Sequence, residues 1–185
     1  MSVPGTERPG SVAVRLMAQA DGVAFARFLS NVPAGERRFL KESQQEATTA
    51  FDVDLRPDTR VRRLVAVEPD GDVVGFAGAF PGSGWSSHVA ELRVLVSATC
   101  RRRGVGRALA RAALVEAFDL GCSQAYVEVV AEQEELVAMF QDMGFEPTAL
   151  LPDFVRDGAG DFHDLMLLTH RTDDQRGVGL EELAT

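Results

Sequence analysis

Apolar and polar positions in the first third of the chain predict a strand, two helices and a loop. The stretch SVAVRLM, residues 11–17, alternates apolar and polar side chains, which is typical of a strand. Residues 20–32 repeat apolar positions at helical spacing, and Asp21 near their start is a candidate N-cap. Residues 34–47 are consistent with a second helix, whereas the acidic residues and the proline within residues 48–59 favour a loop.

The rest of the chain begins with a hairpin and continues with alternating strands and helices. Residues 62–81 hold two β-rich runs around Pro69-Asp70-Gly71-Asp72, a sequence typical of a hairpin turn. The elements that follow are a strand at 88–96, a helix at 104–121 ending at a glycine, a strand at 124–130, a short helix at 132–145 closed by Gly144, and a last strand at 161–170. This order predicts an α/β protein with a mixed sheet and helices on both faces.

The length and composition fit a single globular domain. The chain has 185 residues, of which 45% are hydrophobic and 25% charged. Residues 1–10 lack the apolar core of a secretory signal and are expected to be a flexible N-terminus, and residues 171–185 a polar tail. We therefore expect one domain over residues 11–170. No run approaches the ~20 apolar residues that span a bilayer, so no membrane partner is expected.

The charge balance argues against nucleic acid as a partner. There are 28 acidic and 19 basic residues, giving a net charge of -9, whereas nucleic-acid binding needs a basic surface. An acidic chain suits a cationic small molecule or peptide, although a solvated acidic surface is the simpler explanation. The two cysteines, Cys100 and Cys122, favour reduced thiols in a cytoplasmic protein. The three histidines lack the paired spacing of a zinc site, so no metal is expected.

An arginine- and glycine-rich turn stands out against this acidic background. Arg101, Arg102 and Arg103 follow a predicted strand, and Gly104 and Gly106 open the predicted helix. Unpaired N–H groups and the positive dipole end of a helix bind phosphate, and glycines let the backbone approach the ligand. The turn therefore predicts an anion site, with a basic helix cap that binds nothing as the alternative.

Two familiar phosphate loops do not match this turn. A Walker loop needs Gly-Lys-Ser/Thr, but Arg107 and Ala108 follow Gly106. A dinucleotide fingerprint needs a third glycine at position 109, where the chain has Leu109.

The pattern Arg101-x-x-Gly104-x-Gly106 resembles the acetyl-CoA pyrophosphate loop of the GCN5-related N-acetyltransferase (GNAT) superfamily. The flanking sequence AELRVLVSATCRRRGVGRALARAAL is similar to that family's strand, loop and long helix, and a following strand and helix close on Gly144-Phe145. A looser resemblance runs from about Val12 to His170. It implies a mixed, mostly antiparallel central sheet of six to seven strands, with pantetheine between the separating strands at residues 92–96 and 126–130.

The resemblance also implies the cofactor, acetyl-CoA, and the residues that bind it. A backbone N–H near Val94 or Leu95 would polarise the thioester carbonyl. The cofactor-binding residues implied are Leu95, Val96, Arg101, Arg102, Arg103, Gly104, Val105, Gly106, Arg107, Ala108, Gln133 and Phe140.

Two residues are candidates for the base that the acceptor amine requires. A lysine-like amine has a pKa near ~10.4 and must lose a proton before it attacks. His88 titrates near neutral pH, with an exposed loop histidine as the alternative. Glu91 is the second candidate, with a structural ion pair to Arg93 as its alternative. Strand alternation puts His88 and Glu91 on opposite faces unless a bulge intervenes, as it often does in the family.

The general acid expected from the resemblance is absent. The family's usual tyrosine, four residues before the glycine of Gly144-Phe145, is Phe140 here, and a phenyl ring cannot protonate a thiolate. The chain's only tyrosine, Tyr126, lies on a predicted strand, where a packed aromatic is the simpler explanation. A thiol with a pKa of roughly 8.5 is a tolerable leaving group, so this loss need not abolish turnover.

The sequence thus predicts an N-acetyltransferase that moves acetyl from acetyl-CoA to a primary amine by direct transfer in a ternary complex. The alternative is a non-catalytic acyl-CoA-binding or regulatory module, for which Phe140 is the main support. Homodimers are common in the resembled family. Four residues around the last predicted hairpin, where relatives build acceptor pockets, are more simply an ordinary polar turn: Asp153, Arg156, Asp157 and His163.

Overall fold

The computed structural model describes residues 12–32 and 60–172. The predicted helix at 34–47 and loop at 48–59 lie outside the described residues. The helices are α1 (Gly22–Ser30), α4 (Val105–Asp119) and α5 (Glu134–Gln141), with 3-10 turns at Gln19–Asp21, Gly84–Ser86 and Ala98–Cys100. The strands are β1 (Ala13–Leu16), β2 (Arg62–Val67), β3 (Val73–Pro81), β4 (Val89–Val96), β5 (Gln124–Val130), β6 (Glu146–Arg156) and β7 (Phe162–Arg171).

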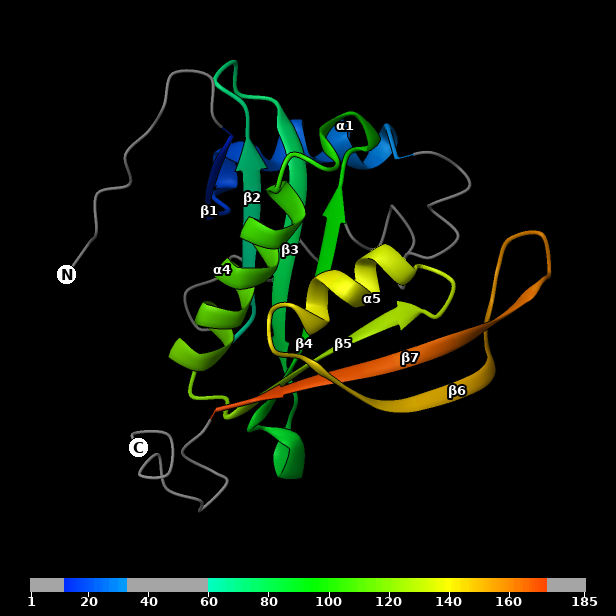
Figure 1. Cartoon of the computed structure of the whole chain (residues 1–185). Helices are drawn as coiled ribbons and strands as arrows, with labels where there is room; N and C mark the ends of the chain where they lie inside the picture. Colours follow the sequence, from blue (N-terminus) through cyan, green and yellow to red (C-terminus); the bar gives the residue numbers. More distant parts are fainter. Residues whose placement is uncertain (1–11, 33–59, 173–185) are drawn as a thin grey trace, which may run out of the picture.

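Seven strands form one sheet in the order β1-β2-β3-β4-β5-β7-β6 (Figure 1). All neighbours are antiparallel except β4 and β5, which are parallel. The predicted mixed, mostly antiparallel sheet is confirmed. No bounds were predicted for β6, the first strand of the last hairpin, because it is an edge strand whose side chains are largely exposed and whose pairing with β7 shifts register twice.

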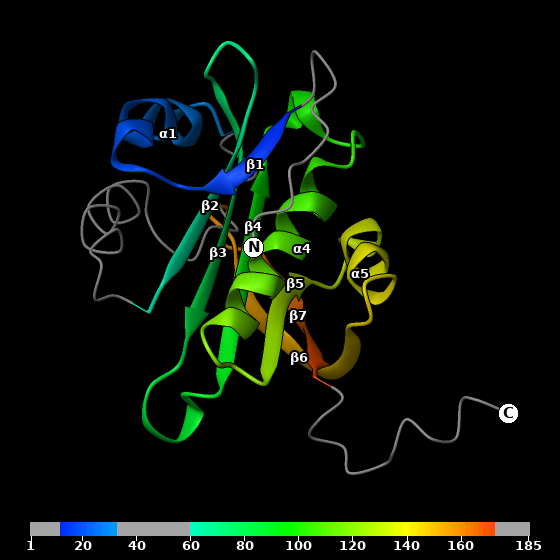
Figure 2. The ribbon, with the colours of Figure 1, turned by 90° about the vertical axis from the view of Figure 1, so that its left-hand side faces the viewer.

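Helices cover both faces of the sheet, as predicted (Figure 2). On one face, α1 buries Phe25, Phe28 and Leu29 against Val65 of β2 and Phe76 of β3. The opposite face packs against α4 and α5 in the larger cluster, which includes Leu64, Ala77, Leu92, Leu109 and Phe140. Alternate residues of β2 thus serve two cores, as the two-residue period of a strand requires.

The start of α1 differs from the prediction. Asp21 precedes the helix, but its carboxylate makes no side-chain cap to α1. Instead Asp21 Oδ2 accepts a hydrogen bond from Ala18 N at 2.7 Å, and both oxygens bind the Arg15 guanidinium at 2.6 and 2.7 Å. The hydrogen bond from Arg15 lowers the pKa of Asp21. The carboxylate therefore fastens the β1–α1 turn to β1 rather than capping the helix.

None of the helices within residues 12–32 and 60–172 has the length and apolar character that crossing a bilayer requires.

Candidate active site

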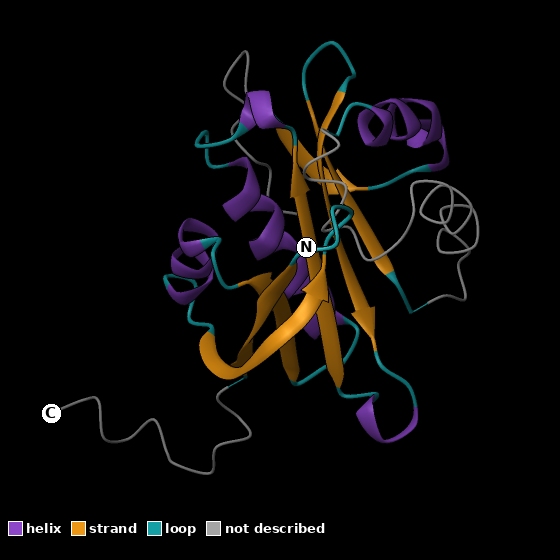
Figure 3. Cartoon of the chain, turned by 90° about the vertical axis from the view of Figure 1, so that its right-hand side faces the viewer, coloured by secondary structure: helices purple, strands orange, loops and turns teal. Residues whose placement is uncertain are grey.

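Strands β4 and β5 are paired only at their amino-terminal ends. Their parallel register joins three residue pairs, from Val89↔Gln124 to Glu91↔Tyr126. Beyond this point β4 continues beside β3, and β5 continues beside β7. The two strands separate toward their carboxyl ends in Figure 1, and Figure 3 shows the same sheet from its right-hand side. We call the last pair, Glu91 and Tyr126, the apex of this separation.

The backbone of β4 directs alternate residues toward β3 and toward β5. Ser97 N–H donates to Val74 O on β3 at 2.9 Å. At the other end of β4, the backbone oxygen of His88 accepts hydrogen bonds from Ser123 N at 2.9 Å and from Gln124 N at 3.2 Å, on the β5 side. In an extended strand the N–H and C=O of one residue point the same way, and those of the next residue point the opposite way. Odd-numbered residues of β4 therefore bond to β3.

This alternation selects between the two backbone donors considered above. The β3–β4 register runs without a shift from Gly75↔Val96 to Pro81↔Ala90, so β4 has no bulge. Leu95 consequently turns its N–H to β3, whereas Val94 and Val96 turn theirs toward the separation. The 3.4 Å hydrogen bond from Arg101 Nη2 to Val96 O agrees with this direction.

The turn between β4 and α4 has an unusual backbone. Gly104 has φ +80° and Arg102 has φ +58°, both in the left-handed region. Glycine occupies that region freely, but a side chain makes it costly, so Arg102 is strained. Residues 101–104 are exposed. Two residues of this turn, one of them not a glycine, thus adopt the left-handed conformation.

The first turn of α4 presents unpaired backbone donors. The first intrahelical bond runs from Ala108 N–H to Gly104 O at 3.0 Å, and Gly104 has no side chain to cap the helix. The N–H groups of Val105, Gly106 and Arg107 therefore have no acceptor within the helix. A Cβ at Gly106 would lie 3.5 Å from Val96 Cγ2, an ordinary contact, so the fold itself does not demand glycine there. These features fit a diphosphate lying close to the backbone.

Three arginines of the turn and the first turn of α4 are paired with carboxylates from distant elements. Arg102 bonds Glu135 of α5 at 2.6 Å, and both side chains are about four-fifths exposed, 81% and 79%. Arg107 bonds Asp142 at 2.8 Å, and Arg103 bonds Glu68 at 3.2 Å. An anion binding here must share or displace these carboxylates.

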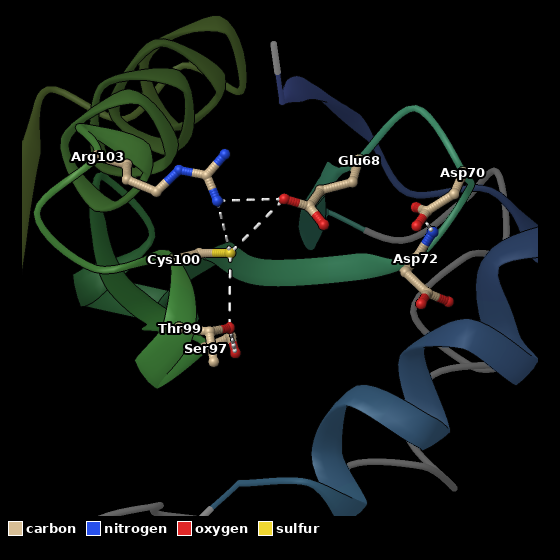
Figure 4. A network of polar contacts seen from close by, with 7 residues as sticks. All are labelled: Glu68, Asp70, Asp72, Ser97, Thr99, Cys100 and Arg103. Atoms are coloured by element: carbon tan, nitrogen blue, oxygen red, sulfur yellow. Dashed lines mark hydrogen bonds and ion pairs between the residues drawn. The ribbon is translucent and has the colours of Figure 1, made fainter. Parts of the chain in front are cut away.

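The ion pair between Arg103 and Glu68 lies beside the buried thiol of Cys100 (Figure 4). Cys100 Sγ lies 3.4 Å from Arg103 Nη1 and 3.9 Å from Glu68 Oε1. Glu68 also accepts the turn hydrogen bond from Gly71 N at 2.9 Å through its backbone carbonyl. Through Glu68, the turn of the β2–β3 hairpin is thereby linked to the residues that precede α4. Cys100 and Cys122 are both buried and free.

The apex holds an ion pair and a phenol on the face that α1 covers. Arg93 binds Glu91 through two hydrogen bonds of 2.9 and 3.2 Å, and the Glu91 side chain is only 12% exposed. The Tyr126 hydroxyl lies 3.5 Å from Glu91 Oε2. The Arg93 guanidinium also stacks 4.4 Å from the ring centroid of Phe80. The alternative proposed for Glu91, an ion pair with Arg93, is therefore present, and it sits where the strands part.

His88 lies away from the apex. It is exposed in the turn before β4, next to the first pair of the parallel ladder. The three paired residues stand between it and the separation of the strands. The structure therefore brings Glu91, but not His88, to the point where β4 and β5 diverge.

The two α5 residues implied by the resemblance have different environments. Gln133 occupies the N-cap position of α5 and is exposed just after β5. Phe140 is 3% exposed and packs edge-on against Phe145, with ring centroids 5.2 Å apart. Phe140 is thus a core residue.

The β6–β7 hairpin carries a histidine between two carboxylates. His163 Nε2 lies 3.3 Å from Asp157 Oδ2, and His163 Nδ1 lies 3.3 Å from Glu132 Oε1. The hydrogen bond to Asp157, followed by that to Glu132, raises the pKa of His163. Asp157 also accepts from Ala159 N and Asp161 N, closing the hairpin turn. These contacts fasten the hairpin to the segment between β5 and α5.

Comparison with known proteins identifies the class. The family model described as the acetyltransferase (GNAT) family matches residues 16–145, which is most of the chain. This chain therefore belongs to the GNAT acetyltransferase family, and the arginine–glycine turn and the separating strands fall within the matched region.

Individual relatives match more narrowly. The Escherichia coli (strain K12) protein named uncharacterized N-acetyltransferase YjgM is 33% identical over 81 residues, covering 43% of this chain and 48% of YjgM. Mycothiol acetyltransferase from Mycobacterium sp. (strain JLS) is 49% identical over 61 residues, covering 32% of this chain and 20% of that protein. The chain thus spans about half or less of these curated relatives.

A solved structure matches nearly the whole described fold. It is that of a GCN5-related N-acetyltransferase from Kribbella flavida, 27% identical, with a TM-score of 0.71, and the match covers 88% of this chain and 98% of that one.

Sequence reasoning missed the carboxylate partners and the apex contact. Glu135 and Asp142 lie 33 and 35 residues from the arginines they bind. Tyr126 lies 35 residues from Glu91. No local pattern links residues at such distances, and only the sheet register brings them together. The one available signal was that Tyr126 is the chain's single tyrosine.

Proposed function

We propose that this chain transfers the acetyl group of acetyl-CoA to a primary amine, by direct attack within a ternary complex. The observation that carries the proposal is the continuity of β4 with the strained, donor-rich turn that opens α4. Bound acetyl-CoA supplies the acetyl group as a thioester.

The turn and α4 would hold the phosphates of the cofactor. The N–H groups of Val105, Gly106 and Arg107 lack helical acceptors, and Gly106 leaves the approach open. Arg101, Arg102 and Arg103 add forked donors suited to phosphate oxygens. We assign the side chains of Arg107, Ala108 and Gln133 to the periphery of this site.

The free edges of the separated strands would hold the pantetheine. An extended amide chain can pair with a strand edge as an added strand does. Val94 and Val96 turn their backbone groups toward this edge, and the N–H of Val94 is our choice for the donor to the thioester carbonyl. A fixed donor at a carbonyl that gains negative charge stabilises the transition state.

Glu91 is our choice for the base. Its carboxylate is mostly buried at the apex, and Arg93 orients it with two hydrogen bonds. The ion pair favours the charged, unprotonated carboxylate, which is the form that can accept a proton. Because the same ion pair makes the carboxylate a weaker base, we expect the proton to reach it from the amine through a water. The acidic chain, with a net charge of -9, suits a cationic acceptor.

The test is calorimetric titration with acetyl-CoA, followed by measurement of CoA release with a panel of amines. The panel would contain polyamines, amino acids, aminoglycosides and peptides with free N-termini. Binding with release on some amine supports the proposal. No binding overturns it, and binding without release on the panel favours the non-catalytic module. Light scattering on the same sample tests whether this chain forms the homodimer that is common in the family.

A further inference from the structure

The position that the family gives to the acid leaves no proton donor here. Phe140 has no hydroxyl, and its ring is 3% exposed against Phe145 on the face that α4 and α5 cover. A side chain that protonates the departing thiolate therefore has to lie on a different element.

The apex supplies a phenol in a suitable place. Glu91 and Tyr126 are register partners, so their side chains leave the sheet on the same face. The phenol oxygen lies 3.5 Å from Glu91 Oε2, and both residues end the parallel ladder where the strands open. Tyr126 is half-buried.

The ordinary ionisation of the apex groups decides which one can give a proton. A carboxyl with a pKa of about 4.3 is ionised near neutral pH, and a guanidinium does not release its proton. A phenol with a pKa of about 10 is protonated near neutral pH and can release its proton. Of Glu91, Arg93 and Tyr126, only Tyr126 meets both conditions.

We propose that Tyr126 is the general acid of the transfer, in place of the tyrosine that the family has at the position of Phe140. We further propose that Glu91 returns a proton to Tyr126 after each transfer. This inference rests on the proposed function. In the step, the amine nitrogen bonds to the acetyl carbon as the carbon–sulfur bond breaks. The amine proton passes to Glu91, directly or through water, while the Tyr126 proton passes to the sulfur. Transfer from Glu91 to the Tyr126 oxygen then returns both groups to their starting states, so the net change moves one proton from nitrogen to sulfur.

The first experiment needs no turnover. Because Tyr126 is the only tyrosine in the chain, the ultraviolet absorbance of tyrosinate reports its ionisation alone. A neighbouring negative charge raises the pKa of a phenol, so Glu91→Gln should lower the tyrosinate midpoint by about 1 unit. Glu128→Gln, one β5 position further along the same face, is the control. An unchanged midpoint in Glu91→Gln would overturn the relay.

The second experiment is kinetic. Tyr126→Phe keeps the ring and removes the hydroxyl, and it should lower kcat by about 10²-fold with the Kd for acetyl-CoA and the melting temperature unchanged. Replacing Tyr126 with a fluorotyrosine of lower phenol pKa should move the alkaline limb of the kcat profile to lower pH, which a packing role would not do.

The outcomes separate the two proposals. A wild-type chain that turns over while Tyr126→Phe keeps its full kcat overturns the general acid and leaves the proposed function standing. A wild-type chain that binds acetyl-CoA but acetylates no amine overturns the proposed function, and the relay with it.

Discussion

At the scale of single residues, the two glycines of the phosphate turn have different reasons to be glycine. Gly104 has φ +80°, which a side chain makes costly. Gly106 lies inside α4, and a Cβ there would meet Val96 and Met139 at ordinary distances. Gly104 therefore serves the fold, whereas the fold alone gives no reason for glycine at position 106 and the proposed ligand would supply one.

Alanine at each position should separate these reasons. Gly104→Ala should lower the free energy of unfolding by about 1–2 kcal/mol because it forces a left-handed side chain. Gly106→Ala should raise that free energy by up to ~1 kcal/mol through helix propensity, yet weaken acetyl-CoA binding by about tenfold or more. Denaturant unfolding and calorimetry measure both quantities. Equal affinity in Gly106→Ala and wild type would mean that the ligand does not approach this backbone.

The exposed carboxylate on Arg102 should compete with the phosphates. Glu135→Gln removes the 2.6 Å ion pair and one negative charge beside the site. Because exposed pairs of this kind are worth about 0.2–1 kcal/mol, the variant should bind acetyl-CoA about 1.4- to fivefold more tightly at low salt. Glu134→Gln, an exposed neighbour without such a pair among the described residues, is the matched control. If both variants bind alike, Arg102 does not contact the ligand.

At the scale of elements, the alternation of β4 makes a prediction about individual amides. Leu95 bonds to β3, so its N–H should exchange slowly with deuterium whether or not ligand is present. The N–H groups of Val94 and Val96 face the separation, so they should exchange rapidly in the free protein and slowly with acetyl-CoA. Residue-resolved hydrogen exchange by NMR measures this. Protection of Leu95 alone on binding would reverse our choice of the thioester donor.

Local patterns were enough for most elements but not for the apex. The hairpin at residues 62–81 and the helix ending before Gly121 were predicted because turn chemistry and helical spacing are local signals. The arginine–glycine turn could be picked out because its residues are consecutive, and phosphate binding there stays a prediction. Whether β4 has a bulge depends on its register with β3, and the Glu91–Tyr126 contact depends on a parallel pairing across an intervening helix. Neither relation is written in any short stretch of sequence.

At the scale of the whole molecule, His163 ties the β6–β7 hairpin to the segment that leads into α5. Its pKa is raised in the folded protein by Asp157 and then by Glu132. A raised folded pKa means that the contribution to stability is fully present below about pH 6.5, the unfolded value, and is lost as the pH rises through the folded value.

The pH dependence of melting should therefore change when this histidine is removed. The melting temperature of wild type should exceed that of His163→Gln at pH values below about 6.5, and the difference should shrink steadily toward alkaline pH. His88→Gln, at an exposed turn, should parallel wild type throughout. A His163→Gln profile with the same slope as wild type would show that the two carboxylates do not stabilise the protonated ring.

The short ladder between β4 and β5 has a consequence for handling the protein. Three residue pairs join the two halves of the sheet, and beyond them no described strand pairs with the facing edges of β4 and β5. Such strand edges can pair with extended segments of other chains, so the ligand-free protein is expected to aggregate through them. Saturating acetyl-CoA should occupy these edges, so turbidity during storage at high protein concentration should rise more slowly with the cofactor than without it. Solubility and catalysis would then both depend on the separation of β4 and β5.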